Sequence, residues 1–142
     1  MHREGGVTER ATIESVIRST YAARIKGDVD GTMANFADDA VFEFNGRGAG
    51  LPGMGVQILT KNAIRPVMQQ LIDNFRFADW KEIAVLVDGN RAFLHWRAMV
   101  TSPVSGKSAE FDVFDLFTFR DGKIVALHQS TDTAMVLTLV SA

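Results

Sequence analysis

The spacing of apolar residues changes after Phe75 from a helical period to a strand period, and this change limits the folds that the chain can adopt. Over residues 8–26 and 60–75 the apolar side chains recur every three or four positions, which is typical of helices with one buried face. After Phe75 the apolar side chains alternate with polar ones, as they do in half-buried strands. Helices followed by a run of strands predict an α+β domain, with the helices packed on one face of an antiparallel sheet.

Shorter signals complete the predicted order of elements. A second helix is expected over residues 28–36, capped by Asp28 or Asp30, and a turn over residues 37–39. The tripeptide Asp88-Gly89-Asn90 is typical of a tight hairpin between two of the later strands. The remaining predictions are a loop over residues 46–55 and strands over residues 40–45, 77–87, 91–100, 110–119 and 124–132.

The composition narrows the classes of function. With 142 residues, 46% of them hydrophobic and 23% charged, the chain is expected to form one soluble domain over residues 1–142, in which residues 1–7 are a flexible tail. The apolar runs are too short to cross a bilayer and the start lacks a secretory pattern, so we expect a cytoplasmic protein. A net charge of −2 without a basic cluster argues against nucleic acid and favours a small molecule or a second copy of the chain as partner.

Neither a metal nor a cofactor is predicted. The chain has no cysteine, which excludes thiolate ligands and nucleophiles, and its three histidines are not spaced as metal ligands. Residues 48–53 match the glycine pattern of dinucleotide-binding loops, but that loop must turn directly into a helix inside a parallel βαβ unit. Pro52 and the antiparallel strands that follow are incompatible with such a unit, so the match is interpreted as accidental.

Asp115 is the most unusual residue of the predicted strands. Alternate side chains of a strand share one face, so the neighbours of Asp115 are all apolar: Phe111, Val113, Phe117 and Phe119. A buried carboxylate is costly unless it is paired, hydrogen-bonded or protonated. The strand is therefore expected to form either the wall of a pocket with one polar contact or a core network in which Asp115 is structural.

The strand over residues 92–100 has one apolar face and one mixed face. The mixed face carries Phe93, His95, Arg97 and Met99. Aromatic, apolar and ionisable side chains on one face are expected either in a mainly apolar cavity with a few polar groups or at an exposed rim. Both interpretations are open at the level of the sequence.

The register between this strand and the strand of Asp115 is equally open. The connection over residues 101–109 is long enough to permit either parity, and a slip of one residue exchanges the two faces. In one register Asp115 joins the mixed face, where cationic neighbours would lower its pKa. In the other it lies among Leu94 and Trp96, where loss of hydration would raise its pKa.

Two stretches of the sequence resemble a known family. KGDVDGTMANFADDAVFEF at residues 26–44 and DLFTFRDGKIV at residues 115–125, together with the order of elements, resemble the SnoaL-like and ketosteroid-isomerase-like branch of the NTF2-like superfamily. The resemblance implies a cystatin-like cone, often homodimeric, in which a curved antiparallel sheet packs against three N-terminal helices around an apolar pocket. Members of the superfamily include isomerases, polyketide cyclases, epoxide hydrolases, dehydratases and proteins with no known catalysis.

The match to the steroid isomerases is partial at their catalytic positions. Asp115 falls where those enzymes keep a protonated aspartic acid that donates a hydrogen bond to the developing oxyanion. Phe44 stands in place of their general base. Thr20 stands in place of their oxyanion tyrosine, with Tyr21 one residue out of phase. Steroid isomerisation of that kind is therefore not carried over to this chain.

The match to the epoxide hydrolases of the superfamily is also partial. Those enzymes use an Asp-Arg-Asp arrangement, of which Arg97 matches the arginine, whereas Met99 and Gln129 replace the two carboxylates. The same alignment favours the register in which the mixed face of residues 93–99 shares the pocket with Asp115.

Two functions follow as hypotheses. The first is an enzyme that transfers protons on a small apolar carbonyl compound, as an isomerase, cyclase or dehydratase, with His95 as acid or base, Asp115 as its orienting or oxyanion-binding partner and Arg97 as anion holder. The second is a non-catalytic ligand-binding or accessory protein that keeps the pocket. The residues expected to contact the ligand are Phe42, Phe44, Tyr21, Thr20, Phe93, Met99, Phe117, Leu127 and Gln129.

A homodimer is predicted through the outer face of the sheet. Phe114 and Leu116 on one strand and Ile124 and Ala126 on the next leave an apolar surface that the helices cannot also cover. The resemblance directs His128 to this same face, where the family commonly forms its dimer contact.

Overall fold

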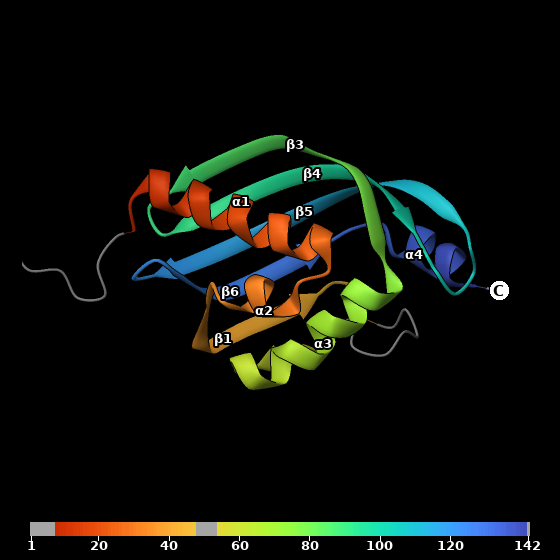
Figure 1. The fold of residues 1–142 in the computed structure, drawn as a ribbon. Coiled ribbons are helices and arrows are strands. Elements are labelled where there is room, and N and C mark those ends of the chain that lie inside the picture. Colours follow the sequence, from red (N-terminus) through yellow and green to blue (C-terminus); the bar gives the residue numbers. More distant parts are fainter. Residues whose placement is uncertain (1–7, 48–53, 142) are drawn as a thin grey trace, which may run out of the picture.

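The computed structural model describes residues 8–47 and 54–141. Its helices are α1 (Arg10–Lys26), α2 (Val29–Met33), α3 (Lys61–Asn74) and α4 (Thr133–Val140), and its strands are β1 (Phe36–Phe44), β2 (Gln57–Leu59), β3 (Arg76–Asp88), β4 (Arg91–Thr101), β5 (Ser108–Arg120) and β6 (Lys123–Ser130). The strands form one curved sheet, α1, α2 and α3 lie along one of its faces, and α4 lies at one end (Figure 1). The α+β prediction is confirmed. The predicted tail and most of the predicted glycine-rich loop fall outside the described residues.

The sheet is mixed rather than antiparallel throughout. Its strand order is β2-β1-β6-β5-β4-β3, and the predicted antiparallel meander is confirmed for β3 to β6. The expectation of an entirely antiparallel sheet is wrong, because β1 pairs with β6 in parallel, with Phe42 opposite Leu127 and Phe44 opposite Gln129. This pairing of distant segments brings the end of β1 to the same point of the sheet as the end of β6.

Local signals fix most of the element boundaries. Gly27 ends α1 with a φ of 81°, in the left-handed region that favours glycine, and Asp28 caps α2 through its side chain. Thr60 caps α3 in the same way. Two boundary predictions are wrong, because α2 ends at Met33 rather than at residue 36, and residues 37–39 extend β1 instead of forming a turn.

The last helix, α4, has no counterpart among the predicted elements. Its sequence TAMVLTLV is almost wholly apolar, so it lacks the alternation of polar and apolar positions by which an amphipathic helix is detected. Asp132 caps the start of α4, because its side chain accepts a hydrogen bond from the main-chain N–H of Met135. The strand β6 ends at Ser130, two residues earlier than predicted. None of the helices in the described part of the chain has the length and hydrophobicity needed to cross a membrane.

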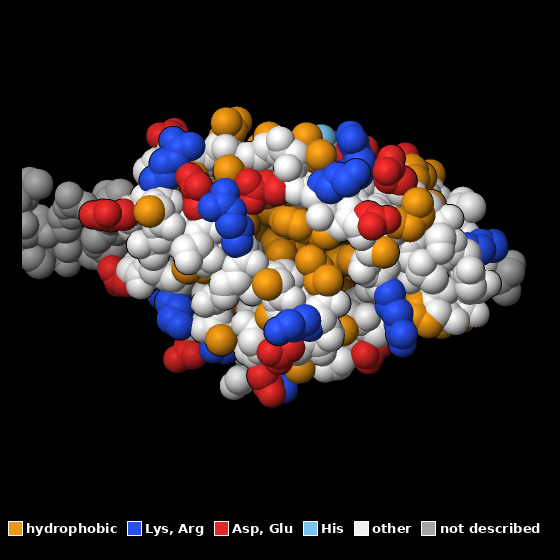
Figure 2. All heavy atoms as spheres, turned by 45° about the horizontal axis from the view of Figure 1, so that its top comes forward, with side chains coloured by type: hydrophobic (Ala, Val, Ile, Leu, Met, Phe, Trp, Pro, Cys, Tyr) orange, Lys and Arg blue, Asp and Glu red, His pale blue; other side chains and the backbone are white. Residues whose placement is uncertain are grey.

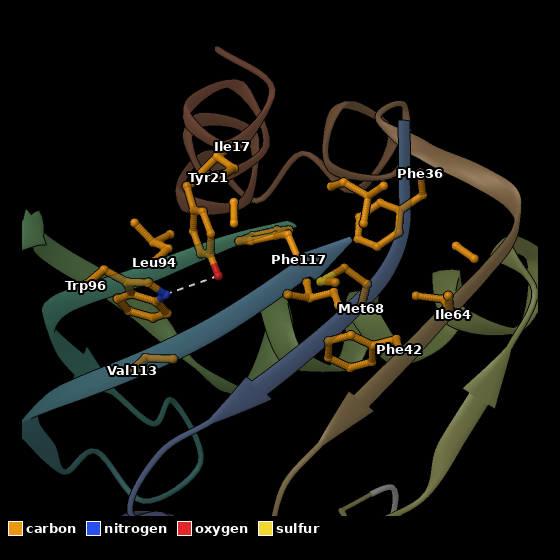
Figure 3. Packing of buried hydrophobic residues seen from close by; sticks show 14 of the residues in the cluster. Ile17, Tyr21, Phe36, Phe42, Ile64, Met68, Leu94, Trp96, Val113 and Phe117 are labelled. Atoms are coloured by element: carbon orange, nitrogen blue, oxygen red, sulfur yellow. Dashed lines mark hydrogen bonds between the residues drawn. The ribbon is translucent and has the colours of Figure 1, made fainter. Parts of the chain in front are cut away.

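The core lies between the helices and the inner face of the sheet (Figure 3). Phe36 and Phe42 from β1 and Phe117 from β5 point into it, together with Ile17 and Tyr21 from α1, and all are nearly or fully buried. Burying one such side chain stabilises the fold by about 1.5–3 kcal/mol. The helix that carries Tyr21 is thus held against the sheet at a defined position.

A bulge in β3 brings an additional ring to Tyr21. Between Ala78 and Lys81, β3 has one residue more than β4, and Asp79 adopts a φ of 54°. The extra residue turns Trp80 toward α1, where its ring stacks on that of Tyr21 with 5.3 Å between the ring centroids. The bend in the strand therefore shapes the surroundings of this tyrosine.

The outer face of the sheet carries part of the predicted apolar surface. Phe114 and Leu116 are 40% and 38% exposed there, and Ala126 lies half-buried on the same face. Ile124 is fully buried, because a bulge in the β5–β6 ladder shifts the register and turns this side chain inward. Its assignment to the outer surface is wrong, whereas His128 lies on the outer face as expected.

Candidate ligand site

The β4–β5 ladder decides the face that Asp115 occupies. Leu94 lies directly opposite Asp115, and Trp96 lies opposite Val113. Residues opposite each other in an antiparallel ladder project to the same face, so Asp115 joins the apolar residues of β4 and is completely buried. The register favoured by the family alignment, with His95 beside Asp115, is therefore wrong.

The mixed face of β4 belongs to the outer surface. His95 Nε2 lies 2.7 Å from Oδ1 of Asp112, and Arg97 Nε donates to the same oxygen at 2.8 Å. The hydrogen bond from His95, joined by that from Arg97, lowers the pKa of Asp112. Phe93 stacks on Phe114 beside this cluster, and Met99 is exposed on the same face. The structure thus separates both cationic candidates from Asp115 by the thickness of the sheet.

Asp115 accepts hydrogen bonds from three buried side chains on three elements. Tyr21 Oη of α1 and Trp96 Nε1 of β4 donate to its Oδ2, the latter at 2.9 Å. Gln129 Nε2 of β6 donates to its Oδ1 at 2.9 Å. Trp96 Nε1 and Gln129 Nε2 also lie 3.1 and 3.0 Å from Tyr21 Oη, and Figure 3 shows Tyr21 pointing from α1 toward Trp96. These four side chains are called the Asp115 network below.

Tyr21, not Thr20, is the residue of α1 that faces Asp115. Thr20 is buried in another direction, where its hydroxyl donates to the main-chain oxygen of Val16 at 2.7 Å and accepts from Asn35 Nδ2 at 2.9 Å. The alignment therefore places the hydroxyl that faces Asp115 one residue too early. Thr20 is therefore a structural contact between α1 and the segment after α2.

Burial has the largest effect on the pKa values of Asp115 and Tyr21. Loss of hydration raises the pKa of Asp115, and the hydrogen bonds from Tyr21, Gln129 and Trp96 oppose that rise. Desolvation and the neighbouring carboxyl group raise the pKa of Tyr21 well above its usual value, so the phenol keeps its proton and acts as a donor.

Arg24 extends the network and has no counterpart among the predicted site residues. Its Nη2 donates to Oε1 of Gln129 at 3.3 Å, which fixes the amide of Gln129 with its nitrogen toward Asp115. The guanidinium carbon lies 5.8 Å from the ring centre of Tyr21 and 5.2 Å from that of Phe77. A signal does exist in the sequence, because Arg24 follows Ile17 and Tyr21 on the buried face of α1.

A cavity of about 490 Å³ lies between α3, α4 and the end of β1. Its size is typical of sites for small organic molecules. Apolar side chains dominate the wall, and its polar groups come from amides and one hydroxyl. The lining residues of this larger chamber are Phe42, Phe44, Met54, Val67, Gln70, Leu71, Asn74, Phe75, Ser102, Val104, Val136 and Val140.

A smaller chamber of about 40 Å³ adjoins the larger one and reaches the network. It lies where α1, α3 and β3 meet, and Figure 2 shows hydrophobic atoms in a hollow on that face, surrounded by charged side chains. Phe44, Leu71, Phe75 and Val136 line both chambers. The residues that line only the smaller chamber are Arg24, Phe77, Trp96, Val100, Phe111, Val113, Gln129 and Thr131.

The structure brings together only some of the predicted contact residues. Phe42, Phe44 and Gln129 line the chambers. Phe117 and Leu127 are buried on the inner face but are absent from the described lining of both chambers. Tyr21 and Asp115 stand one side chain behind the wall, covered by Gln129 and Trp96.

The sequence of residues 17–127 matches the SnoaL-like domain. This match covers more than half of the chain. The chain belongs to the SnoaL-like domain family. No curated protein matches its sequence significantly.

Solved structures show that this SnoaL-like domain has the NTF2-like fold. An NTF2-like protein of unknown function from Burkholderia pseudomallei is 22% identical with a TM-score of 0.80, over 92% of this chain and 98% of that one. An NTF2-like protein from Burkholderia thailandensis is 26% identical with a TM-score of 0.73, over 90% and 96%. TerC, co-crystallised with polyporic acid, is 22% identical with a TM-score of 0.77, over 92% and 98%.

The part of the SnoaL-like domain that the structure describes contains no group of three or more His, Cys, Asp or Glu residues placed to hold a metal ion. Among the described residues that line the chambers, Arg24 alone carries a charge. The chemistry that the lining offers is therefore hydrogen bonding and a single positive charge, set in an apolar wall.

Proposed function

We propose that this SnoaL-like domain binds a small, mainly apolar carbonyl compound in the two adjoining chambers. The observation that carries the proposal is the lining, in which mainly apolar walls carry a few polar groups: Arg24, Gln129 and Thr131 at the smaller chamber, and Gln70, Asn74 and Ser102 at the larger one. A mainly apolar site with a few placed polar groups is typical of small-molecule sites, and the positive charge of Arg24 distinguishes the smaller chamber from the larger one. The co-crystallisation of TerC with polyporic acid supports a small-molecule role for this fold.

Ligand binding without catalysis is the function that the geometry supports best. A general acid or base must lie within hydrogen-bonding reach of the proton that it moves. None of the described lining residues is a carboxylate, histidine, lysine or tyrosine, and Phe44 stands where the isomerases carry their base.

A ligand screen by thermal shift, followed by calorimetry, tests this proposal. Phe44→Trp adds bulk at a position that lines both chambers, so we expect it to abolish binding of compounds that stabilise the wild type. Phe93→Trp is the matched control, because the same change is made on the outer face of the sheet. Binding that survives Phe44→Trp unchanged would contradict the proposal.

Acid/base catalysis on the same carbonyl compound, of the isomerase, cyclase or dehydratase kind, is the second candidate. Its support is the burial of Asp115, which raises the pKa of this carboxyl group, and its hydrogen bond from Tyr21 directly behind the chamber wall. In such a reaction Gln129 moves aside, a water molecule accepts the α-proton, and neutral Asp115 and Tyr21 donate hydrogen bonds to the developing oxyanion. Exchange of the α-protons of a bound ligand with deuterium, lost in Asp115→Asn, would favour this candidate over simple binding.

A homodimer through the outer sheet face belongs to the same proposal. Phe114 and Leu116 supply exposed apolar area at the centre of this face, with Phe93 beside them. The face is separate from the chambers, so pairing would leave the proposed ligand site intact.

A further inference from the structure

Arg24 is a buried cation with unused hydrogen-bonding capacity. The residue is only 6% exposed, and its Nε–H is buried without a hydrogen-bond partner. None of the salt bridges in the described part of the chain involves it. Burying a charge is costly unless an opposite charge or sufficient hydrogen bonds compensate for it. A further hydrogen-bond acceptor beside Arg24 would therefore stabilise its buried charge.

Asp115 does not contact Arg24 directly. Gln129 lies between them, because its Oε1 accepts from Arg24 and its Nε2 donates to Asp115. Desolvation of Asp115 also favours the neutral form of its carboxyl group. Arg24 therefore has no carboxylate contact in the described part of the chain, and it lines the smaller chamber.

The smaller chamber has the size of one polar group. Its volume of about 40 Å³ exceeds the roughly 10–15 Å³ needed to hold one water molecule, so it has room for a group of a few atoms such as a carboxylate. The chamber shares Phe44, Leu71, Phe75 and Val136 with the larger one. One molecule can therefore place a polar group beside Arg24 and an apolar body in the larger chamber.

We infer that the ligand of this cavity is an apolar carboxylate, whose carboxylate group binds the guanidinium of Arg24 at the smaller chamber. The inference rests on the proposed small-molecule binding and adds the chemical class of the ligand. A guanidinium offers donors in a planar arrangement that matches the two carboxylate oxygens, and such charge-assisted bonds are stronger than those to a neutral amide. Gln129, which already holds Nη2, keeps the guanidinium in place for this contact.

Calorimetry on the full chain with matched probes tests the inference. The probes are 2-naphthoate, cinnamate and 4-phenylbutyrate, each compared with its primary amide at low ionic strength. We expect the wild type to bind the carboxylates about tenfold or more tightly than the amides. Arg24→Met should remove this preference, so that each carboxylate binds within about twofold of its own amide. Arg10→Met is the control, because it removes an exposed arginine from the same helix.

The outcomes separate the inference from the function on which it rests. If amides and carboxylates bind the wild type equally, or if Arg24→Met keeps the preference, the inference is wrong and small-molecule binding stands. If none of the probes binds, both are contradicted. A second measurement uses the wild type alone and so does not require a variant to fold. The ¹⁵Nε chemical shift of Arg24 should change when 2-naphthoate is added. An unchanged chemical shift in a saturated complex overturns the inference.

Discussion

Leu94 lies directly opposite Asp115 in the β4–β5 ladder, and this pairing determines which side chains can share a site with the carboxyl group. Because of this pairing, Asp115 contacts Trp96 on the inner face of the sheet. His95 and Arg97 lie on the outer face and cannot contact Asp115. The partners of Asp115 therefore come from α1, β4 and β6, and the predictions below follow from this arrangement.

The contribution of Asp115 to the free energy of unfolding should decrease as the pH rises. Because burial raises its pKa above the ordinary value of 3.8, the native state holds this proton more tightly than the unfolded chain does. The stabilisation from the protonated group is complete below the unfolded pKa and is lost as the pH rises through the folded pKa. The free energy of unfolding of the wild type minus that of Asp115→Asn should thus decrease above about pH 4, as measured by urea titrations.

Asp112 provides a control of opposite sign for that experiment. His95 and Arg97 lower its pKa, so its contribution to stability is present above the unfolded value of 3.8 and is lost as the pH falls through the folded pKa. The difference between wild type and Asp112→Asn should grow with pH in the acid range. A difference for Asp115→Asn that is constant or that increases with pH would contradict the raised pKa.

Tyr21→Phe should change the titration of Asp115, whereas Thr20→Val should not. Each substitution removes one buried hydroxyl and should destabilise the fold by about 1 kcal/mol. Only Tyr21 donates to Asp115, and that hydrogen bond favours the ionised carboxylate, so its loss should raise the pKa of Asp115 further. The ¹³C resonance of the Asp115 carboxyl group reports the shift, and an equal effect of both variants would disprove the assignment of Tyr21.

His95→Gln and Arg97→Gln should leave the affinity for a cavity ligand within about twofold of the wild-type value. Both side chains contact Asp112 on the outer face and are separated from the chambers by the sheet. Calorimetry with any compound found by the screen provides the measurement. A large loss of affinity in either variant would indicate that the residue does contribute to the ligand site.

Phe114→Glu combined with Leu116→Glu should convert a dimer into a monomer. The two side chains are the exposed apolar residues of β5, and burying two added carboxylates in an interface is unfavourable. Light scattering at micromolar concentration should give twice the monomer mass for the wild type. Val104→Glu, at an exposed position in the loop before β5, is the control and should leave the mass unchanged. A monomeric wild type would contradict the dimer.

The sequence predicts the helices and the antiparallel strands because their signals are local. The change of apolar period, the glycine after α1 and the cap at Asp28 all act within a few residues. The parallel pairing of β1 with β6 depends on contact between segments 85 to 88 residues apart, and no local pattern encodes it. The helix α4 is missed for another reason, since an almost uniformly apolar segment has no detectable period.

The candidate site is only partly readable from the sequence for the same physical reason. Asp115 is detectable because a charge interrupts an apolar face. Its true partners are not, because a slip of one residue in the ladder exchanges His95 for Leu94 and Trp96. Arg24 is detectable in principle from its place on the buried face of α1, yet its role depends on contacts with Gln129 that only the fold creates.

Arg24 donates a hydrogen bond to Gln129, and Gln129 donates one to Asp115, so the arginine and the carboxyl group are connected through the amide. The charge of Arg24 helps Asp115 to ionise, so an anion that neutralises Arg24 makes Asp115 hold its proton more tightly. Occupancy of the cavity and proton uptake then promote each other by the same factor. At a pH where Asp115 is partly ionised, the heat released on binding would accordingly depend on the ionisation enthalpy of the buffer, in proportion to the fraction of a proton taken up.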